Sequence, residues 1–415
     1  MVPRAVSKSY FPTPLRRAHL LLQQVLAGAT LLGCGPDLPS KPRSTVRDSA
    51  GITIVENRGD ARRAALGWRL VATPAVDIGG KSATGPYRVV EATRLGDGRI
   101  VVASAGTNAL DLYAPDGRHL RTIGRPGSGP GEFQALFWVG RLPADSIAAW
   151  DAALGRLSVF SPAGDFVRAV TSRNSLGLFP LAAGVLGDGR LLIAVRSAEA
   201  GAGSGVRVRR DDVSYVALDA RGGVQPIGRF PGTEMLLSGG ATGGLLMRPL
   251  PFGRQTVAAA HGGRVYVGTG DAFELRGYEP RQGLLTIIRT EHAPVAVTRA
   301  AIRDYRRTLV TLGAEGDARL RQQQAEMLEK APYPEQMPAF TDLEIDADGD
   351  LWTQDSKARG DGGARWTIFS PDGRLRGSIE IPANVVVREI GRDWLLGTVL
   401  DDDQVEHVRI YRLLK

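Results

Sequence analysis

Cysteine is almost absent from this sequence of 415 residues, in which Cys34 is the only one. One cysteine excludes an intramolecular disulfide and any metal site built from several cysteines. Histidine is scarce too: the chain has five, and none stands at the His-x-His or His-Glu-x-x-His spacing of a local zinc site. We therefore expect no metal and no cofactor, and we leave open only ligands that converge from distant segments.

Motifs of common catalytic sites are missing as well. No Gly-x-Ser-x-Gly elbow and no Gly-x-x-x-x-Gly-Lys phosphate loop occurs. The alternating acids Asp346, Asp348 and Asp350 suggest a calcium loop, but here glycine stands fourth and lysine twelfth. An EF-type loop needs glycine sixth and glutamate twelfth. We interpret this run as a hairpin turn, and the three acids at 401–403 as a solvated loop.

Long apolar runs are confined to the N-terminus. Residues 20–32 are mostly apolar and follow Arg16 and Arg17, and residues 31–33, Leu-Leu-Gly, stand directly before Cys34. This layout resembles the lipobox of bacterial lipoprotein signal peptides, in which the cysteine is lipidated and becomes the first mature residue. His19 and two glutamines dilute the run, so an uncleaved or Sec-type signal and a chance pattern are the alternatives.

The lipobox resemblance implies a location and three N-terminal regions. A signal peptide covers residues 1–33, lipidated Cys34 anchors the mature chain to a membrane, and residues 34–50 form a flexible tether. The protein then belongs to the bacterial cell envelope and faces the periplasm or the exterior. Removal of residues 1–33 lowers the formal net charge from +8 to +4, because four basic residues and no acid lie there. We therefore expect no nucleic acid as partner.

Two series of glycine turns repeat along the rest of the chain. The motif Leu-Gly-Asp-Gly-Arg occurs at residues 95–99 and again at 186–190, each time before a short apolar strand. Asp-Gly suits a tight hairpin, because glycine adopts the positive φ that the turn needs. A second series, Pro-Asp-Gly or a variant, stands at 115–117, 162–164, 219–222, 280–283 and 371–373. Together they predict five repeats of four strands in a radially repeated β-protein.

A sixth repeat is divided between the two ends of the chain. Residues 70–79 can supply one strand, and the other three come from segments at 385–387, 394–397 and 408–411. Closure by an N-terminal strand removes the exposed sheet edge of an open array. The sequence thus predicts an all-β fold, a monomeric six-bladed β-propeller over residues 51–415. Seven blades is the alternative if residues 52–55 form more than a peripheral strand.

The second repeat carries a family resemblance. Residues 151–164, Asp-Ala-Ala-Leu-Gly-Arg-Leu-Ser-Val-Phe-Ser-Pro-Ala-Gly, resemble an NHL-type repeat, and residues 124–133 resemble the loop between two blades of that family. The resemblance implies a six-bladed propeller of the NHL or TolB-like type. The match is looser elsewhere, since Ala109 and His407 stand where the repeat has arginine. Because this fold hosts enzymes, binding proteins and scaffolds, it implies no specific activity.

Propeller loops separate onto two sides. Turns between first and second and between third and fourth strands share one side, here called the short-turn side. The other connections share the long-loop side, which receives the long segments 197–210, 230–255, 290–340 and 356–365. Loops on a rigid scaffold carry binding sites, so this side is the candidate surface. Thr298 can cap a helix, which predicts a small helical insertion at 298–338 between blades 4 and 5, either a lid or a rim element.

Basic and aromatic residues gather on the long-loop side. The candidate ligand-binding residues are Arg207, Arg209, Arg254, Arg303, Tyr305, Tyr333 and Trp366. Arginine forks and aromatic rings suit a protein partner or a small anionic or glycan-like ligand, whereas solvated loop charges are the plainer alternative. Our leading hypothesis is a non-catalytic binding protein.

Two other function classes stay open. The NHL resemblance also allows an enzyme, a metal-dependent lactonase-type hydrolase or a lyase, in which acids from several blades would line the central channel. The acids that could contribute are Glu91, Asp151, Asp271 and Asp355. The third class is a purely structural scaffold.

Overall fold

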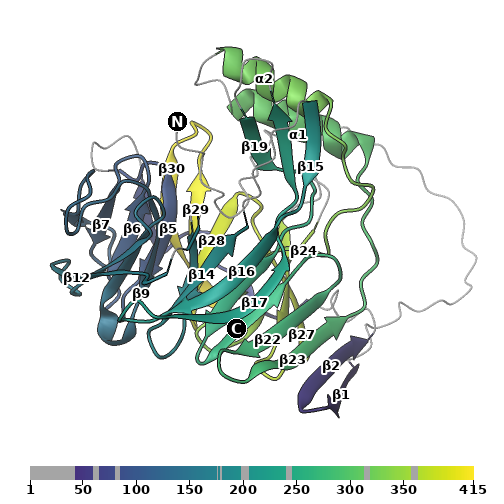
Figure 1. The fold of residues 1–415 in the computed structure, drawn as a ribbon, viewed down its shortest axis with the longest axis horizontal. Coiled ribbons are helices and arrows are strands. Elements are labelled where there is room, and N and C mark those ends of the chain that lie inside the picture. The colour runs from purple at the N-terminus through teal and green to yellow at the C-terminus, as the bar shows by residue number, and fades with distance from the viewer. Residues whose placement is uncertain are drawn as a thin grey trace, which may run out of the picture.

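The computed structural model describes residues 43–58, 65–79, 85–174, 176–177, 180–197, 205–239, 245–312, 318–356 and 363–415. The predicted signal peptide, Cys34 and the start of the predicted tether lie outside these ranges. Strands dominate the described chain, which contains two α-helices. No helix in these ranges is long and apolar enough to cross a membrane. Figure 1 shows the sheets side by side through the body of the molecule and both helices at its top.

We number the main sheets in chain order, and the first three are antiparallel sheets of four strands each. Sheet 1 contains β5 Val89–Arg94, β6 Ile100–Ser104, β7 Ala109–Tyr113 and β8 His119–Ile123. Sheet 2 contains β9 Leu136–Arg141, β10 Ile147–Asp151, β11 Arg156–Phe160 and β12 Phe166–Thr171. Sheet 3 contains β13 Leu181–Val185, β14 Leu191–Arg196, β16 Asp212–Leu218 and β17 Val224–Pro231.

The remaining main sheets are built on the same plan, with additions from the N-terminal region. Sheet 4 contains β20 Val257–His261, β21 Arg264–Gly268, β22 Glu274–Glu279 and β23 Gly283–Thr290. Sheet 5 contains β24 Phe340–Ile345, β25 Leu351–Asp355, β26 Ala364–Phe369 and β27 Leu375–Ile381. Sheet 6 contains β28 Val385–Ile390, β29 Trp394–Leu400, β30 Glu406–Leu414, β3 Arg69–Leu70 and β4 Val76–Gly79.

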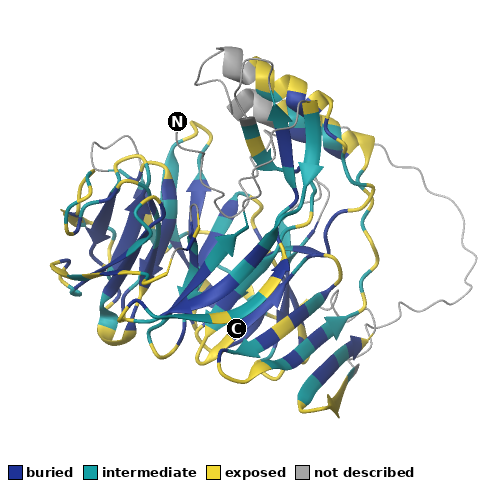
Figure 2. Ribbon diagram, viewed as in Figure 1, coloured by how far each residue is buried: buried dark blue, intermediate teal, exposed yellow. Residues whose placement is uncertain are grey.

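The first strands of these sheets contact one another in a closed order. β5 contacts β9, and the series continues through β13, β20, β24 and β28 back to β5. Each pair of neighbouring sheets shares one apolar core. Trp150 and Ile193, for example, lie in the core between sheets 2 and 3. Figure 2 shows these buried strands in the body of the molecule. The result is a propeller-like fold, in which every sheet is covered on both faces.

The repeated Leu-Gly-Asp-Gly-Arg motif forms the same hairpin turn twice, as the sequence predicts. Gly98 and Gly189 have φ of 90° and 83°. In both turns the aspartate accepts a hydrogen bond of 3.1 Å from the amide of the following arginine. Local side-chain bonding and a left-handed glycine together fix the turn, and this places the turns of β5–β6 and β13–β14 on the short-turn side.

Sheet 6 joins both ends of the described chain. β4 pairs antiparallel with β30, so that Gly79 lies opposite His407 and Val76 lies opposite Ile410. β3 pairs with the last residues of the same strand. Within the predicted closing segment 70–79, ladder pairing thus involves Val76–Gly79 and Leu70.

The N-terminal segment differs from the prediction. Residues 43–49, expected to belong to a flexible tether, form β1 Arg43–Ser49, which pairs with β2 Ile52–Arg58. β2 in turn runs parallel to β23 and extends sheet 4 at its outer edge, so it is a peripheral strand. The tether prediction is wrong for residues 43–49, because this segment pairs along its whole length with β2, from Arg43 opposite Arg58 to Ser49 opposite Ile52.

A second difference is a small sheet outside the main six. β15 Gly205–Arg209, β18 Met235–Gly239 and β19 Leu245–Pro249 form three antiparallel strands, although their segments were expected to be loops. The two helices, α1 Arg299–Leu312 and α2 Ala318–Glu329, pack with this sheet (Figure 1). We call these five elements the insertion module.

Helix α1 begins as the sequence predicts. The Thr298 hydroxyl oxygen accepts a hydrogen bond of 3.1 Å from the Ala301 amide, which satisfies one of the free N–H groups of the first turn. Asp317, whose side chain could cap the second helix, and the glycine-rich residues 240–244 lie outside the described residues.

Candidate functional site

The insertion module has its own apolar core, separate from those of the main sheets. Its buried members come from both helices and from the small sheet: Leu236, Leu250, Tyr305, Met327, Leu328 and Ala331. Because side chains alternate along a strand, the sheet face that carries Leu236, Val206 and Val208 packs on the helices.

The opposite face of the small sheet carries a different set of residues. Arg207, Arg209, Met235, Leu237 and Met247 share it by register, and we call it the second face. Leu237 is fully buried, whereas Met247 is 46% exposed. The two arginines are partly exposed, and Arg209 forms an ion pair of 2.6 Å with Asp211. The second face therefore combines an exposed thioether with cationic side chains.

Two of the three aromatic residues predicted to contact a ligand are buried in apolar cores. Trp366 is 2% exposed and lies in the core between sheets 5 and 6, because it belongs to β26 and not to the preceding loop. Tyr305 is 8% exposed in the module core, and its hydroxyl accepts a hydrogen bond of 3.0 Å from Arg248. Tyr333 is half-buried and donates a hydrogen bond of 2.7 Å to the Leu328 carbonyl. The prediction of Trp366 and Tyr305 as ligand contacts is therefore wrong, and that of Tyr333 stays a prediction.

Arg254 is committed to acidic side chains. Its guanidinium donates to Glu234 at 2.9 Å and to Asp271 at 2.9 Å, and Arg210 joins the same network through Asp271 at 2.7 Å. The hydrogen bond to Glu234 raises the pKa of Arg254, and the charge of Asp271 adds to the effect. The role of Arg254 as a ligand-binding residue stays a prediction, and an anion would compete with these two acids for the guanidinium. Arg303 is exposed on α1.

The four acids considered for an enzyme are not brought together. Asp151 is fully buried and accepts four backbone N–H bonds, the shortest of 2.6 Å from Gln134. Asp271 serves the arginine network, and Asp355 accepts a hydrogen bond of 2.8 Å from Thr367. Glu91 lies on β5. Within the ranges that the structure describes, no three His, Cys, Asp or Glu side chains cluster as metal ligands.

The innermost strands share a feature that the sequence did not reveal. β5, β9, β13, β24 and β28 each contain a β-bulge, and bulges redirect the side chains beside them. In three neighbouring sheets the residue after the bulge is an acid: Glu91, Asp342 and Glu389. The signal in the sequence was a polar pair, Arg-Glu, after three valines in β28.

Glu389 and Arg388 connect sheet 6 to sheet 1. The Glu389 carboxylate accepts hydrogen bonds from the Thr93 hydroxyl at 2.9 Å and the Arg94 amide at 2.8 Å. Burial raises the pKa of Glu389, and these two hydrogen bonds oppose that shift only in part. Arg388 is 5% exposed and donates to the Val90 carbonyl at 2.9 Å. The innermost strand of sheet 6 thus holds a partly buried carboxyl group with a raised pKa.

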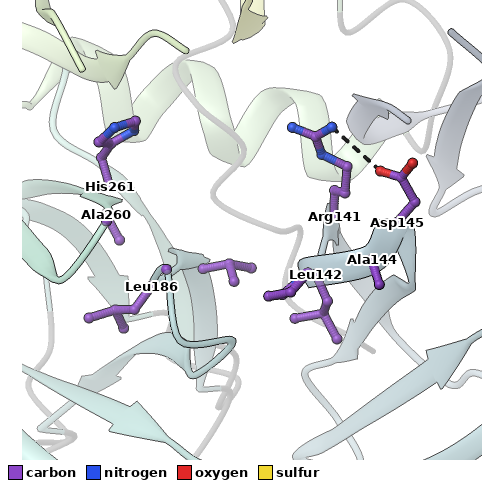
Figure 3. Close-up of a pocket in the computed structure, with 11 residues that line it drawn as sticks. Arg141, Leu142, Ala144, Asp145, Leu186, Ala260 and His261 are labelled. Atoms are coloured by element: carbon purple, nitrogen blue, oxygen red, sulfur yellow. Dashed lines mark hydrogen bonds and ion pairs between the residues drawn. The ribbon is translucent and has the colours of Figure 1, made fainter. Parts of the chain in front are cut away.

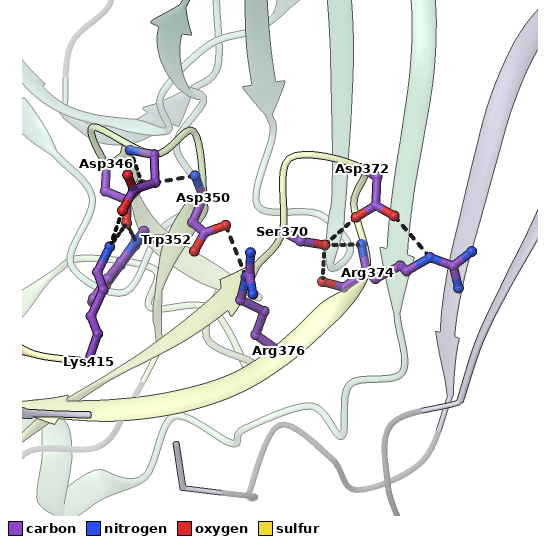
Figure 4. A network of polar contacts seen from close by, with 9 residues as sticks. Asp346, Asp350, Trp352, Ser370, Asp372, Arg374, Arg376 and Lys415 are labelled. Carbon is purple, nitrogen blue, oxygen red and sulfur yellow. Dashed lines mark hydrogen bonds and ion pairs between the residues drawn. The ribbon is translucent and has the colours of Figure 1, made fainter. Parts of the chain in front are cut away.

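The aspartates that suggested calcium form a hairpin turn, as predicted (Figure 4). Asp346 is 1% exposed and accepts hydrogen bonds from the Asp350 amide at 2.9 Å and the Lys415 ammonium at 2.8 Å. Burial, then the charge of Asp346, raises the pKa of Asp350, which is paired with Arg376 at 3.0 Å. Protein cations thus occupy the positions around these carboxylates.

The sequence matches no protein family and no curated protein. Among solved structures, the chain is similar to a Bacteroides fragilis protein whose name marks it as exported. The identity is 12% over 87% of this chain and 99% of the other, with a TM-score of 0.48. Virginiamycin B lyase from Staphylococcus aureus has 10% identity, coverage of 84% and 99%, and a TM-score of 0.41. A gluconolactonase from Xanthomonas campestris has 12% identity, coverage of 91% and 97%, and a TM-score of 0.42.

Proposed function

We propose that this protein is a lipid-anchored envelope β-propeller of six blades, closed by an N-terminal strand, that binds a protein partner or an anionic ligand on its long-loop side without catalysing a reaction. The observation that carries the proposal is the insertion module. It has a separate core and is built from three long-loop connections. The six main sheets contact one another in a closed order without the elements of this module, so we infer that the module serves recognition.

The second face of the module is the proposed contact surface. Met247 is 46% exposed on β19, and Arg207 and Arg209 lie on β15, across the central strand β18. Methionine adapts to partners of different shape, and arginine pairs with carboxylates in two parallel hydrogen bonds. The combination of methionine and arginine favours a partner protein with an acidic surface over a partner with a purely apolar surface.

Site-specific photo-crosslinking in cells tests the contact surface. A photoreactive phenylalanine analogue replaces Met247 in one strain and Gln323, an exposed residue of α2, in a matched control. We expect a discrete adduct from position 247 alone, and its loss when Arg207→Glu is added. No adduct at 247, or equal adducts at both positions, would contradict the proposal.

The lipid anchor is tested separately. Leu-Leu-Gly before Cys34 supports lipidation, so Cys34→Ala is expected to abolish lipid labelling and to release the protein into the soluble fraction. Unchanged membrane fractionation of this variant, with no mass shift on Cys34 in the wild type, would remove the anchor from the proposal while leaving the binding surface untouched.

The alternative function is an enzyme of the lactonase-type hydrolase or lyase class. The partly buried Glu389, whose pKa is raised, is the observation that favours it, since perturbed carboxyl groups concentrate at active sites. Hydrolysis of a panel of lactones by the wild type, lost in Glu389→Gln while the fold is retained, would establish the enzyme. Turnover unaffected by this substitution would exclude Glu389 as the reacting group.

A further inference from the structure

The short-turn side contains a pocket of about 390 Å³, away from the insertion module. It is lined by the turns of three consecutive sheets: residues 141–145 after β9, 185–187 after β13, and 260–262 after β20. Leu142 and Leu186, both buried, form an apolar base. Figure 3 shows Arg141 and His261 on opposite walls of this pocket.

The Arg141 guanidinium has an open side. Its Nη1 donates to Asp145 at 3.5 Å, and its side chain is 45% exposed. In the described part of the protein, Nε and Nη2 have no hydrogen-bond partner. These two N–H groups point in parallel, which is the fork that binds a carboxylate or phosphate with two hydrogen bonds.

His261 provides a second donor across the pocket. It is exposed at the end of β20, and its ring forms no hydrogen bond or ion pair within the described residues. An imidazole donates from one nitrogen when neutral and from both when protonated. Arg141 and His261 can therefore address the same small anion from two sides, while the apolar base accommodates its carbon skeleton.

The walls of the pocket are fixed before any ligand arrives. Ala144 and Asp145 both have φ of 59°, although neither is glycine, and such residues occur at strained functional turns. Asp145 holds this turn to sheet 1 by accepting a hydrogen bond of 3.1 Å from the Gly96 amide. On the other wall, the Gly187 amide donates to the Gly262 carbonyl. A preformed site loses less entropy on binding.

We propose that this pocket binds a small organic carboxylate, held by Arg141 and His261 over the apolar base. Asp145 is the acid that faces the same space, and its carboxylate is engaged by Gly96 and Arg141. The site lies on the side opposite to the proposed partner surface. It therefore adds a second ligand to the proposed function and does not depend on it.

Calorimetric titration of the full chain with benzoate tests the proposal, with benzamide as the neutral isostere and inorganic phosphate as the second oxyanion. Benzoate is expected to bind saturably and benzamide at least tenfold more weakly. Arg141→Ala and His261→Ala should each weaken benzoate at least tenfold, and Arg141→Lys should fall between Arg141→Ala and the wild type. The matched control is Arg264→Ala, an exposed arginine that does not line the pocket.

The outcomes separate the ligand sources. Phosphate binding without benzoate binding, with the same dependence on Arg141 and His261, would overturn the carboxylate and reassign the fork to phosphate groups. Equal binding by Arg141→Ala, His261→Ala and Arg264→Ala would overturn the site, as would the absence of saturable binding of either anion. Thermal melts of each variant establish that a lost signal does not come from unfolding.

Discussion

The imidazole of His407 lies directly against the backbone of Gly79, with no room for a Cβ atom between them. The two residues stand opposite each other where β4 meets β30. The same ring contacts Asp77 at 2.7 Å through Nδ1 and Asp401 at 3.2 Å through Nε2. One side chain thus ties the N-terminal strand to two parts of sheet 6.

Gly79→Ala is expected to weaken this junction. The new methyl group must displace the His407 ring, and overpacking of this kind costs about 1–3 kcal/mol. We expect a lower free energy of unfolding in urea. The matched control is Gly67→Ala, because a Cβ atom there meets nothing within 4 Å. Equal stability of the two variants would show that His407 does not hold β4.

Acid should loosen the same junction. The Val405 amide, with a contribution from His407, lowers the pKa of Asp401 below its ordinary value of 3.8. A carboxylate with a depressed pKa in the folded state stabilises the fold above its unfolded pKa, and this stabilisation disappears as the pH falls through the folded value. Between about pH 5 and pH 2, the free energy of unfolding should therefore fall less steeply with decreasing pH for Asp401→Asn than for the wild type. Asp402→Asn, which changes an exposed neighbour, is the matched control.

Asn57→Ala should release the N-terminal hairpin. The Asn57 amide is 2% exposed and bonds to the Arg289 carbonyl at 3.1 Å, the Gly373 carbonyl at 3.0 Å and the Leu375 amide at 2.9 Å. Loss of these bonds leaves buried backbone groups without partners, at about 3 kcal/mol in total. Chemical denaturation measures the loss, and exposed Asn174→Ala is the control. A change below about 0.5 kcal/mol would contradict a docked hairpin.

Ala144→Gly should stabilise the protein. A left-handed conformation costs a non-glycine residue about 1–2 kcal/mol. Glycine avoids this cost, but it loses more backbone entropy on folding, which offsets part of the gain. We expect a gain of about 0.5 kcal/mol in thermal or urea unfolding, and a loss for the reverse change Gly349→Ala, where φ is 86°. Destabilisation by Ala144→Gly would show that the turn is not strained.

The regular part of the fold could be predicted from the sequence because its signals are local. Asp-Gly turns and alternating strands lie within a few residues of each other, and Gly98 and Gly189 adopt the expected conformation. The small sheet of the insertion module could not be predicted, since β15 pairs with β18 about thirty residues away. Its stability depends on helices that follow much later in the chain.

The candidate site was harder to predict for the same reason. Arg254 looked available in the sequence, but Glu234 and Asp271 neutralise it after folding. Trp366 follows a polar loop, yet β26 begins two residues earlier and turns its ring into the core. Arg141 and His261 are 120 positions apart in the sequence, and only the ring of sheets brings both to one pocket.

A disulfide across the junction of β4 and β30 tests the closed ring most directly. Asp77 lies opposite Arg409, and facing residues of antiparallel strands have the Cα separation that a disulfide needs. With Cys34→Ala removing the single native cysteine, mild oxidation of Asp77→Cys/Arg409→Cys should link the two ends of the native chain, detected by mass and gel mobility. The pair Asp77→Cys/Arg412→Cys, offset by three residues along β30, should stay reduced. Failure of the first pair to link, or equal linking of both pairs, would contradict closure of the ring by β4.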